Sequence, residues 1–147
     1  MLGLDLVEIS RIKEMAQKHK GRFLDRVFTP AELEYCMTKT VMRFPELAAR
    51  FAAKEAVVKA LGTGMRGISW KEVEVIRNPL GKPDILLHDR AAGIAEQLGV
   101  VHIHISLTHA RDTSAAVAIL EYGHEEEHDS VPAPEEDTNH LDHHAVS

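Results

Sequence analysis

Cysteine is almost absent from this sequence: Cys36 is the only one in 147 residues. A disulfide within the chain is therefore excluded, and we expect a reducing, cytoplasmic location. The sequence also lacks an apolar run long enough to span a bilayer and the basic-then-apolar start of a signal peptide. We therefore expect no membrane association. The length fits a domain that buries a core without disulfides.

Lys and Arg are absent from the C-terminal part of the chain. From Gly123 onwards there are eight acidic residues and no basic one, with almost no apolar periodicity. We predict a folded domain over 1–122 and an acidic, His-containing disordered tail over 123–147. The net charge of −6 hides this division, because 1–122 holds 15 acidic against 17 basic residues. One hypothesis is that the tail imitates an acidic partner and competes for a basic surface.

Such a basic surface is predicted near the N-terminus. The stretch 11–26 contains six basic residues and only two acidic ones. It suits an anionic partner such as an acidic protein, a nucleotide or a nucleic acid, although a solvated helix face has the same composition. Aromatic residues make up only 5% of the chain. Their scarcity and the acidic tail argue against nucleic-acid binding.

The hydrophobic patterns predict an α+β, hairpin-rich domain with an antiparallel sheet and a long buried helix. Helices are expected over 8–18, from the capping sequence at 29–32, over 45–61 and over 89–98. Strands are expected over 2–7, 68–77, 84–87, 101–107 and 115–121, with a turn at 78–83.

The helix at 45–61 is apolar nearly all round, yet it contains Lys54, Glu55 and Lys59. On a helix surface, Glu55 and Lys59 would form an ordinary ion pair at i, i+4. In a buried helix, charge is costly unless it is paired or bound to a metal, so a function is favoured. Asp5, within an apolar strand, either points outward or meets Glu55. Two such carboxylates would suit Mg²⁺.

Two further patterns are weaker. His102, His104 and His109 follow a strand whose polar face they share with Ser106. Such histidines are usually solvent-facing, and as a zinc site they lack a clear third ligand. Residues 62–67 match G-x-G-x-x-G but follow a helix and precede a strand, so we reject a dinucleotide fold. A loop that approaches phosphate through its backbone amides remains open.

The chain resembles the bacterial holo-(acyl carrier protein) synthases, the trimeric type of 4′-phosphopantetheinyl transferase. The resemblance covers about residues 2–121 and follows four landmarks in order. They are Gly3-Leu4-Asp5-Leu6-Val7-Glu8-Ile9-Ser10-Arg11-Ile12, Arg50-Phe51-Ala52-Ala53-Lys54-Glu55-Ala56-Val57-Val58-Lys59-Ala60 continued by Leu61-Gly62-Thr63-Gly64, then Gly81-Lys82-Pro83, and His104-Ile105-Ser106-Leu107-Thr108-His109. The second landmark is long and specific.

The resemblance implies a 4′-phosphopantetheinyl transferase-like fold that assembles as a homotrimer, with active sites between subunits. It implies transfer of 4′-phosphopantetheine from coenzyme A to a serine of apo acyl carrier protein, with 3′,5′-ADP as the leaving group. By the family pattern, Asp5 and Glu55 would bind Mg²⁺ and Lys59 would contact the phosphates. Glu55, directly or through a metal-bound water, would take the serine proton.

The resemblance also suggests residues for the two substrates. Those expected to help bind coenzyme A are Lys54, Gly62, Gly64, Lys82, Ser106 and His109. Those expected to dock the acidic carrier protein by complementary charge are Arg11, Lys18, Arg22 and Arg26.

Two other functions remain open from the residues. A metal-dependent phosphohydrolase could use Asp5, Glu55 and the histidines on coenzyme A or nucleotides, and would need no carrier protein. A non-catalytic binding module could use residues 11–26 on acidic proteins. Replacing Glu55 with Gln separates the classes, because only an enzyme would lose its function. Mg²⁺ and Mn²⁺ are not distinguished, because carboxylate and phosphate oxygens suit both.

Overall fold

The computed structural model describes residues 1–18 and 21–123. Most of the predicted tail, residues 124–147, lies outside the described residues, so its disorder stays a prediction. Within the part of the chain that the structure describes, no helix combines the length and apolar character needed to cross a membrane.

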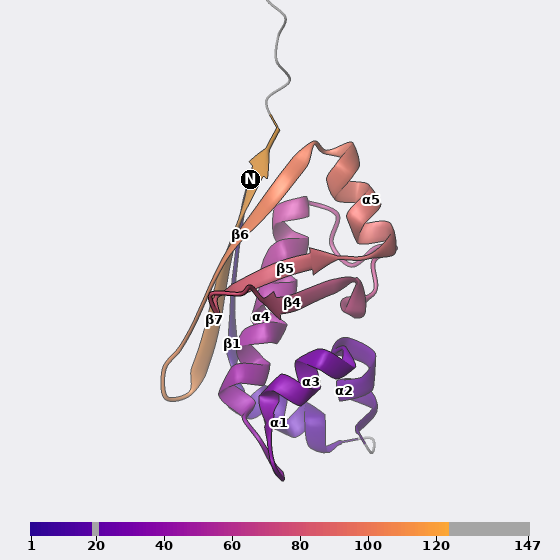
Figure 1. Ribbon diagram of the computed structural model, residues 1–147. Helices are drawn as coiled ribbons and strands as arrows, with labels where there is room; N and C mark the ends of the chain where they lie inside the picture. The colour runs from indigo at the N-terminus through magenta and orange to yellow at the C-terminus, as the bar shows by residue number, and fades with distance from the viewer. Residues whose placement is uncertain (19–20, 124–147) are drawn as a thin grey trace, which may run out of the picture.

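A long helix, α4 (Phe44–Leu61), lies at the centre of the fold. The strands β1 (Leu2–Glu8), β7 (Thr113–Tyr122) and β6 (Val100–His109) form an antiparallel sheet in the order β1-β7-β6 that packs along it. A separate hairpin of β4 (Val73–Arg77) and β5 (Pro83–Leu87) crosses α4 at an angle (Figure 1). The α+β class and the antiparallel sheet with a long buried helix are confirmed.

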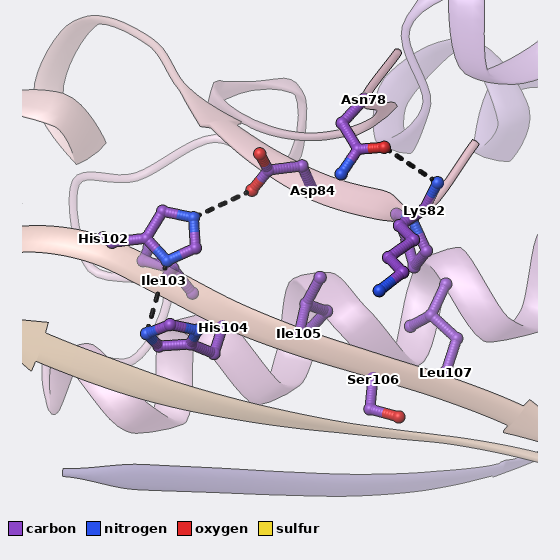
Figure 2. A pocket seen from close by; sticks show the side chains of 10 residues that line it. Asn78, Lys82, Asp84, His102, Ile103, His104, Ile105, Ser106 and Leu107 are labelled. Atoms are coloured by element: carbon purple, nitrogen blue, oxygen red, sulfur yellow. Dashed lines mark hydrogen bonds and ion pairs between the residues drawn. The ribbon is translucent and has the colours of Figure 1, made fainter. Parts of the chain in front are cut away.

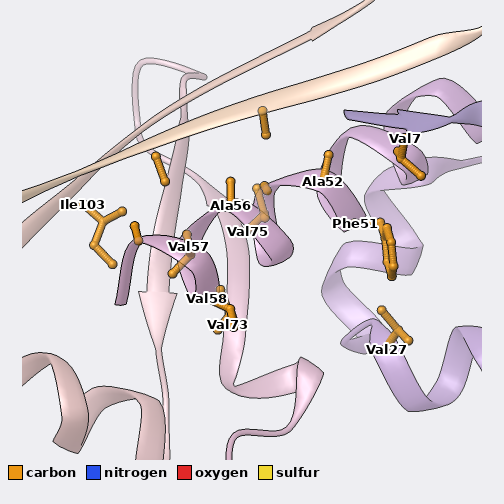
Figure 3. Packing of buried hydrophobic residues seen from close by; sticks show 14 of the residues in the cluster. Val7, Val27, Phe51, Ala52, Ala56, Val57, Val58, Val73, Val75 and Ile103 are labelled. Atoms are coloured by element: carbon orange, nitrogen blue, oxygen red, sulfur yellow. The ribbon is translucent and has the colours of Figure 1, made fainter. Parts of the chain in front are cut away.

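The helix α4 is buried on nearly every side, as its composition predicts. Thirteen of its 18 residues are buried, because small Ala and Val side chains let the sheet and neighbouring helices approach closely. Gly62 ends it with φ 77°, a left-handed conformation that favours glycine. Figure 3 shows Val7, Phe51, Val73 and Ile103, from four different elements, around the same helix.

The remaining elements are short, and their helices lie at the two ends of α4 (Figure 1). Two of them, the helix α2 and the β2–β3 hairpin, are not predicted by the sequence patterns because each is too short to show a period. The elements are α1 Ile9–Gln17, α2 Arg22–Val27, α3 Pro30–Cys36, β2 Met37–Thr38, β3 Val41–Met42, the 3₁₀ turn η2 Trp70–Glu72, β4 Val73–Arg77, β5 Pro83–Leu87 and α5 Asp89–Gln97.

Local sequence signals explain where two of these elements begin. Thr29 accepts a hydrogen bond from the backbone of Glu32, whose side chain accepts one in return, so the predicted capping box of α3 is confirmed. The predicted strand over 68–77 is too long. A second capping box between Ser69 and Glu72 starts η2, and the strand begins only at Val73.

The sheet has one face against α4 and one face turned away from it. Asp5, Ala116 and Leu107 are aligned across β1, β7 and β6 on the α4 face. Leu4 and Ser106 are aligned through β7 on the outer face. The outer face of β1 consists of exposed leucines at positions 2, 4 and 6, with exposed fractions of 59%, 61% and 69%. A monomer would leave this apolar row in water.

Candidate functional site

The first strand approaches the central helix unusually closely. A Cβ atom on Gly3 would lie 1.8 Å from the carbonyl oxygen of Ala56, so only glycine fits at this position. The close contact aligns the middle of β1 with the second half of α4. Asp5, two residues after Gly3, therefore faces the same helix that carries Glu55 and Lys59.

Asp5, Glu55 and Lys59 form one cluster, so of the two orientations of Asp5 that the sequence leaves open, the one towards Glu55 is found. Lys59 Nζ donates a hydrogen bond to Asp5 Oδ1 at 2.8 Å and another to the carbonyl oxygen of Leu4 at 3.2 Å. Burial raises the pKa of the half-buried Glu55, and the negative charge of Asp5 raises it further, against the opposing effect of Lys59 and Arg11. The pKa of Lys59 is raised, chiefly by its hydrogen bond to Asp5.

This cluster has the chemistry of a site for a hard divalent cation. The negative charge of Asp5 raises the pKa of Glu55, which means that the ionised forms of these two carboxylates repel each other. A cation bound between Asp5 and Glu55 would relieve that repulsion, and carboxylate oxygens are ligands that Mg²⁺ prefers. The residues therefore fit Mg²⁺. Its binding is a proposal developed below.

Lys54 does not belong to this cluster, and its predicted role as a coenzyme A ligand stays a prediction. Its side chain is fully buried in the core of the protein. The ammonium donates to Glu32 Oε1 at 2.7 Å and to the carbonyls of Trp70 and Val73 at 3.1 and 2.7 Å. All three of its donors are used. Lys54 therefore connects α3, η2 and β4 to α4.

Two predicted glycines follow the cluster directly. Gly62 and Gly64 both have positive φ, 77° and 59°, and open the loop that leaves α4 one turn beyond Lys59. A Cβ atom at either position would meet no other atom within 4 Å. The loop backbone is therefore accessible beside the carboxylates, and its role in phosphate binding stays a prediction.

Lys82 and Ser106 meet at a separate pocket. It lies between the turn after β4 and the outer strand β6, with a volume of about 390 Å³. Asn78 shapes the turn, because its side-chain oxygen accepts hydrogen bonds from the backbone of Leu80 and Lys82. Figure 2 shows Lys82, Ser106 and Leu107 at one end of the pocket and Asp84, His102 and His104 at the other.

His109 lies apart from that pocket, near the start of α4. Its Nε2 is 3.6 Å from Oε1 of Glu46, and the other oxygen of Glu46 is 3.2 Å from Nη1 of Arg50. The residues predicted to bind coenzyme A therefore lie in three separate places rather than in one cleft. These are the loop at Gly62 and Gly64, the pocket with Lys82 and Ser106, and His109, which shares Glu46 with Arg50.

The sequence interpretation missed a group of arginines around Tyr35, one of which, Arg50, shares Glu46 with His109. The guanidinium carbons of Arg43, Arg50 and Arg77 lie 4.8, 4.1 and 4.8 Å from the centre of the Tyr35 ring. The Nε atoms of Arg43 and Arg50 are buried and have no hydrogen-bond partner. The available signal was Arg50, a charged residue within a helix predicted to be buried. Three guanidinium groups around one ring concentrate positive charge at this end of α4.

The two faces of the sheet separate the groups in a single chain. Asp5 and Glu55 lie between β1 and α4, whereas Ser106 is on the outer face of the sheet. Asp5 is also on the edge strand opposite to β6. One chain therefore does not bring the carboxylate cluster and Ser106 into a common cleft.

The predicted docking residues divide in a similar way. Lys18, Arg22 and Arg26 line a groove whose apolar part comes from Met15 and Phe23. Lys18 also forms an exposed ion pair with Glu14 at 2.8 Å. Arg11 lies outside this groove, close enough to Glu55 for its charge to lower the pKa of that carboxyl. Basic side chains therefore run from the groove at α2 and the end of α1 to Arg11 near the carboxylate cluster.

Comparison with known proteins shows what the chain resembles. The profile of the 4′-phosphopantetheinyl transferase superfamily matches residues 1–120. The chain is 47% identical over 125 residues to the holo-[acyl-carrier-protein] synthase of Moorella thermoacetica, covering 85% of this chain and 96% of that protein. It is 48% identical over 122 residues to the enzyme of the same name from Koribacter versatilis, covering 81% and 95%.

The fold agrees with that relationship. The Helicobacter pylori holo-[acyl-carrier-protein] synthase, whose structure was solved in complex with coenzyme A, superposes with a TM-score of 0.72 at 28% identity. The superposition covers 82% of this chain and all of the other. The sequence and the fold agree: this chain belongs to the 4′-phosphopantetheinyl transferase superfamily.

Proposed function

We propose that this chain is a holo-[acyl-carrier-protein] synthase that transfers 4′-phosphopantetheine from coenzyme A to a serine of apo acyl carrier protein. The observation that carries the proposal is the cluster of Asp5, Glu55 and Lys59 between β1 and α4. The relatives that match almost the whole folded part are named for this reaction. A coenzyme A complex of a related structure supports the donor substrate.

The reaction exchanges the phosphoanhydride bond of coenzyme A for a phosphate ester on the carrier-protein serine. The oxygen of the carrier-protein serine forms a bond to the β-phosphorus of coenzyme A, and the bond from that phosphorus to the bridging oxygen breaks. The serine loses its proton and 3′,5′-ADP leaves with the bridging oxygen. Negative charge therefore develops on the bridging and non-bridging oxygens, and catalysis requires positive charge around them.

Asp5 and Glu55 would hold Mg²⁺ at this position. Bound there, the ion would neutralise charge on the pyrophosphate and help orient it. The two carboxylates come from different elements, and the contact of Gly3 with Ala56 sets their separation. A one-turn shift of β1 along α4 would therefore remove the ion site.

Lys59 and Glu55 have complementary roles beside the pyrophosphate. Lys59 is half-exposed, and its ammonium is able to move from Asp5 to a phosphate oxygen when substrate binds. Glu55 is our candidate for the base that accepts the serine proton. Its raised pKa brings its proton affinity closer to neutral pH, where a general base is most effective.

Coenzyme A would extend from this cluster towards the other groups. The loop at Gly62 and Gly64 would approach the phosphates with its backbone amides. Lys82, Ser106 and His109 would bind further parts of the nucleotide, with the arginines near His109 as an additional cationic contact.

A homotrimer would complete the site. The exposed leucines of β1 and the exposed Ile119 of β7 form an apolar outer face that a second copy would cover. Covering this face would bring Ser106 of one copy close to the neighbouring copy. That arrangement explains how groups separated by the sheet within one chain could serve a common substrate.

The carrier protein would dock on the basic groove. Carrier proteins of this kind are acidic, and Lys18, Arg22 and Arg26 present positive charge around the apolar side chains of Met15 and Phe23. Arg11 would continue that charge towards Glu55. The serine of the docked carrier would then face the carboxylate cluster.

Release of 3′,5′-ADP tests this function against the phosphohydrolase alternative. Coenzyme A and Mg²⁺ are incubated with the full chain, with and without apo acyl carrier protein, and the nucleotide products are separated by chromatography. We expect 3′,5′-ADP only with the carrier protein, in equal amount to holo carrier protein. Release at the same rate without the carrier would identify a hydrolase instead.

A further inference from the structure

Three metal-binding side chains converge on the outer face of the sheet. His102 and His104 point to the same side of β6, because side chains alternate along a strand. Glu121 lies directly opposite His102 on β7. Their ligand atoms all lie within 4.8 Å of one another. The third ligand that the sequence pattern lacked therefore comes from the neighbouring strand.

The distances fit a tetrahedral ion. His102 Nδ1 is 3.4 Å from His104 Nε2, and His104 Nε2 is 3.5 Å from Glu121 Oε2. Ligand atoms bound at about 2.0–2.1 Å to a tetrahedral zinc ion are about 3.3 Å apart. Rotation of the exposed Glu121 side chain would bring its carboxylate oxygen closer to the ring nitrogen of His102. Little rearrangement is needed to bring the three atoms to one ion.

A fourth residue orients the first histidine. Oδ1 of Asp84 lies 3.5 Å from Nε2 of His102, on the side of the ring away from His104. Figure 2 shows the ring of His102 between Asp84 and His104. An acceptor at Nε2 favours the tautomer that carries its proton there, which leaves the lone pair of Nδ1 directed at His104. Metal-bound histidines commonly have such a carboxylate on their second nitrogen.

We propose that His102, His104 and Glu121 bind a divalent transition-metal ion of the zinc class, with Asp84 as the residue that positions His102. Imidazole ligands favour Zn²⁺ over Mg²⁺, so this site and the carboxylate pair of Asp5 and Glu55 select different ions. The two sites are also on opposite faces and opposite edges of the sheet. Three protein ligands leave a fourth position for water or a further ligand.

The site adjoins the pocket that contains Lys82 and Ser106. His102, His104 and Asp84 line the same pocket at its other end (Figure 2). A bound ion would therefore add positive charge beside the region proposed above for coenzyme A. Metal binding itself does not depend on the transfer reaction, because it follows from the four side chains, and the three ligands among them lie on the sheet face where the homotrimer is proposed to assemble.

Zinc titration of the full chain tests the proposal. The tail contains five more histidines, at positions 124, 128, 140, 143 and 144, and imidazole is a common metal ligand. The parent for the titration is therefore the full chain with these five replaced by Gln. We expect calorimetry with Zn²⁺ to give one ion per chain in excess Mg²⁺, and Co²⁺ to give the visible absorption of a tetrahedral site.

Single substitutions in this parent separate a built site from surface binding. His102→Gln and His104→Gln should each abolish the binding, whereas His88→Gln, an exposed histidine paired with Glu74, should leave it unchanged. Asp84→Asn should weaken the affinity about 10- to 100-fold at the same stoichiometry. The proposal is wrong if the parent binds no Zn²⁺, or if His104→Gln binds it as tightly as the parent.

Discussion

Lys59 Nζ donates a hydrogen bond to Asp5 Oδ1 at 2.8 Å, across the contact between the central helix and the first strand. Glu55, one turn before Lys59, is close enough to Asp5 to repel it. A pair of carboxylates thus shares one ammonium group. A divalent cation would compensate the same two charges and would free Lys59 for substrate phosphate.

The first prediction concerns Glu55→Gln. This substitution should lower kcat/KM by at least about 10²- to 10³-fold, the usual cost of losing one charge-stabilising group. The metal-free variant should nevertheless be more stable than the parent at neutral pH. Because folding raises the pKa of Glu55, the folded state binds more protons, and parent stability falls as pH rises above the usual carboxyl range.

Thermal melting of both proteins from pH 4 to pH 8, in chelator and then in Mg²⁺, measures this effect. The range starts close to the unperturbed carboxyl pKa, which is about 4. In chelator, the melting temperature of the parent should drop relative to Glu55→Gln as the pH rises. Mg²⁺ should stabilise the parent more than the variant. Equal responses to Mg²⁺ would show that Glu55 is not a metal ligand.

The second prediction separates Lys59 from the metal site. Lys59→Met should lower kcat by about 10²-fold or more, because it removes positive charge from the transferred phosphoryl group. It should not weaken Mg²⁺ binding, since Asp5 and Glu55 remain and lose a competing cation. Calorimetry with Mg²⁺ and steady-state kinetics measure the two effects, with Lys59→Arg as the charge-retaining control. Loss of both together would place Lys59 in a structural role.

The third prediction concerns the buried ion pair of Lys54 and Glu32. Lys54→Met should destabilise the protein by about 3–5 kcal/mol, because it leaves a buried carboxylate uncompensated. The double variant with Glu32→Gln should recover part of that loss. Denaturant unfolding measures both. Because Lys54 is fully buried, KM for coenzyme A should not change below the melting temperature. A raised KM in a stable variant would return Lys54 to the substrate site.

The fourth prediction concerns assembly through the outer face of the sheet. Light scattering coupled to size-exclusion chromatography should show a trimer. Leu4→Lys should dissociate it, since Leu4 is 61% exposed in one chain and lies in the centre of the apolar row. Leu80→Lys, at an exposed leucine of a distant turn, is the matched control. A monomeric parent, or a trimeric Leu4→Lys variant, would contradict assembly through this face.

The fifth prediction concerns the basic groove. Arg22→Glu together with Arg26→Glu should raise KM for the carrier protein about tenfold or more and should leave KM for coenzyme A unchanged. Added salt should reduce the difference in carrier-protein KM between the variant and the parent, because dissolved ions screen the attraction between surface charges. Lys71→Glu, on the exposed turn before β4, is the control. An unchanged KM in low salt would exclude this groove as the docking surface.

Long periodic elements could be predicted from the sequence because periodicity records burial directly. The helix over 45–61 and the alternation along β6 are examples, and both fix the positions of candidate site residues. Residue 101 is an instructive failure. The pattern places Val101 on the buried side with Ile103, but a bulge between Val100 and His102 turns it outward, leaving it 64% exposed.

Contacts between distant segments could not be predicted from the patterns themselves. Nothing in the sequence near Gly3 shows that a helix carbonyl will lie against it, yet that contact places Asp5 beside Glu55. The ion pair of Lys54 could not be predicted for a related reason, because its partner Glu32 belongs to another helix, 22 residues away. The pairing of Glu121 with the two histidines likewise depends on strand register.

Intact-mass spectrometry of an apo acyl carrier protein tests the central claim most directly. The carrier is incubated with this chain, coenzyme A and Mg²⁺, with chelator and Glu55→Gln as controls. We expect the carrier to gain the mass of one phosphopantetheine group in the complete mixture and in neither control. An unchanged carrier mass with several apo carrier proteins, despite a folded enzyme and bound coenzyme A, would contradict the account.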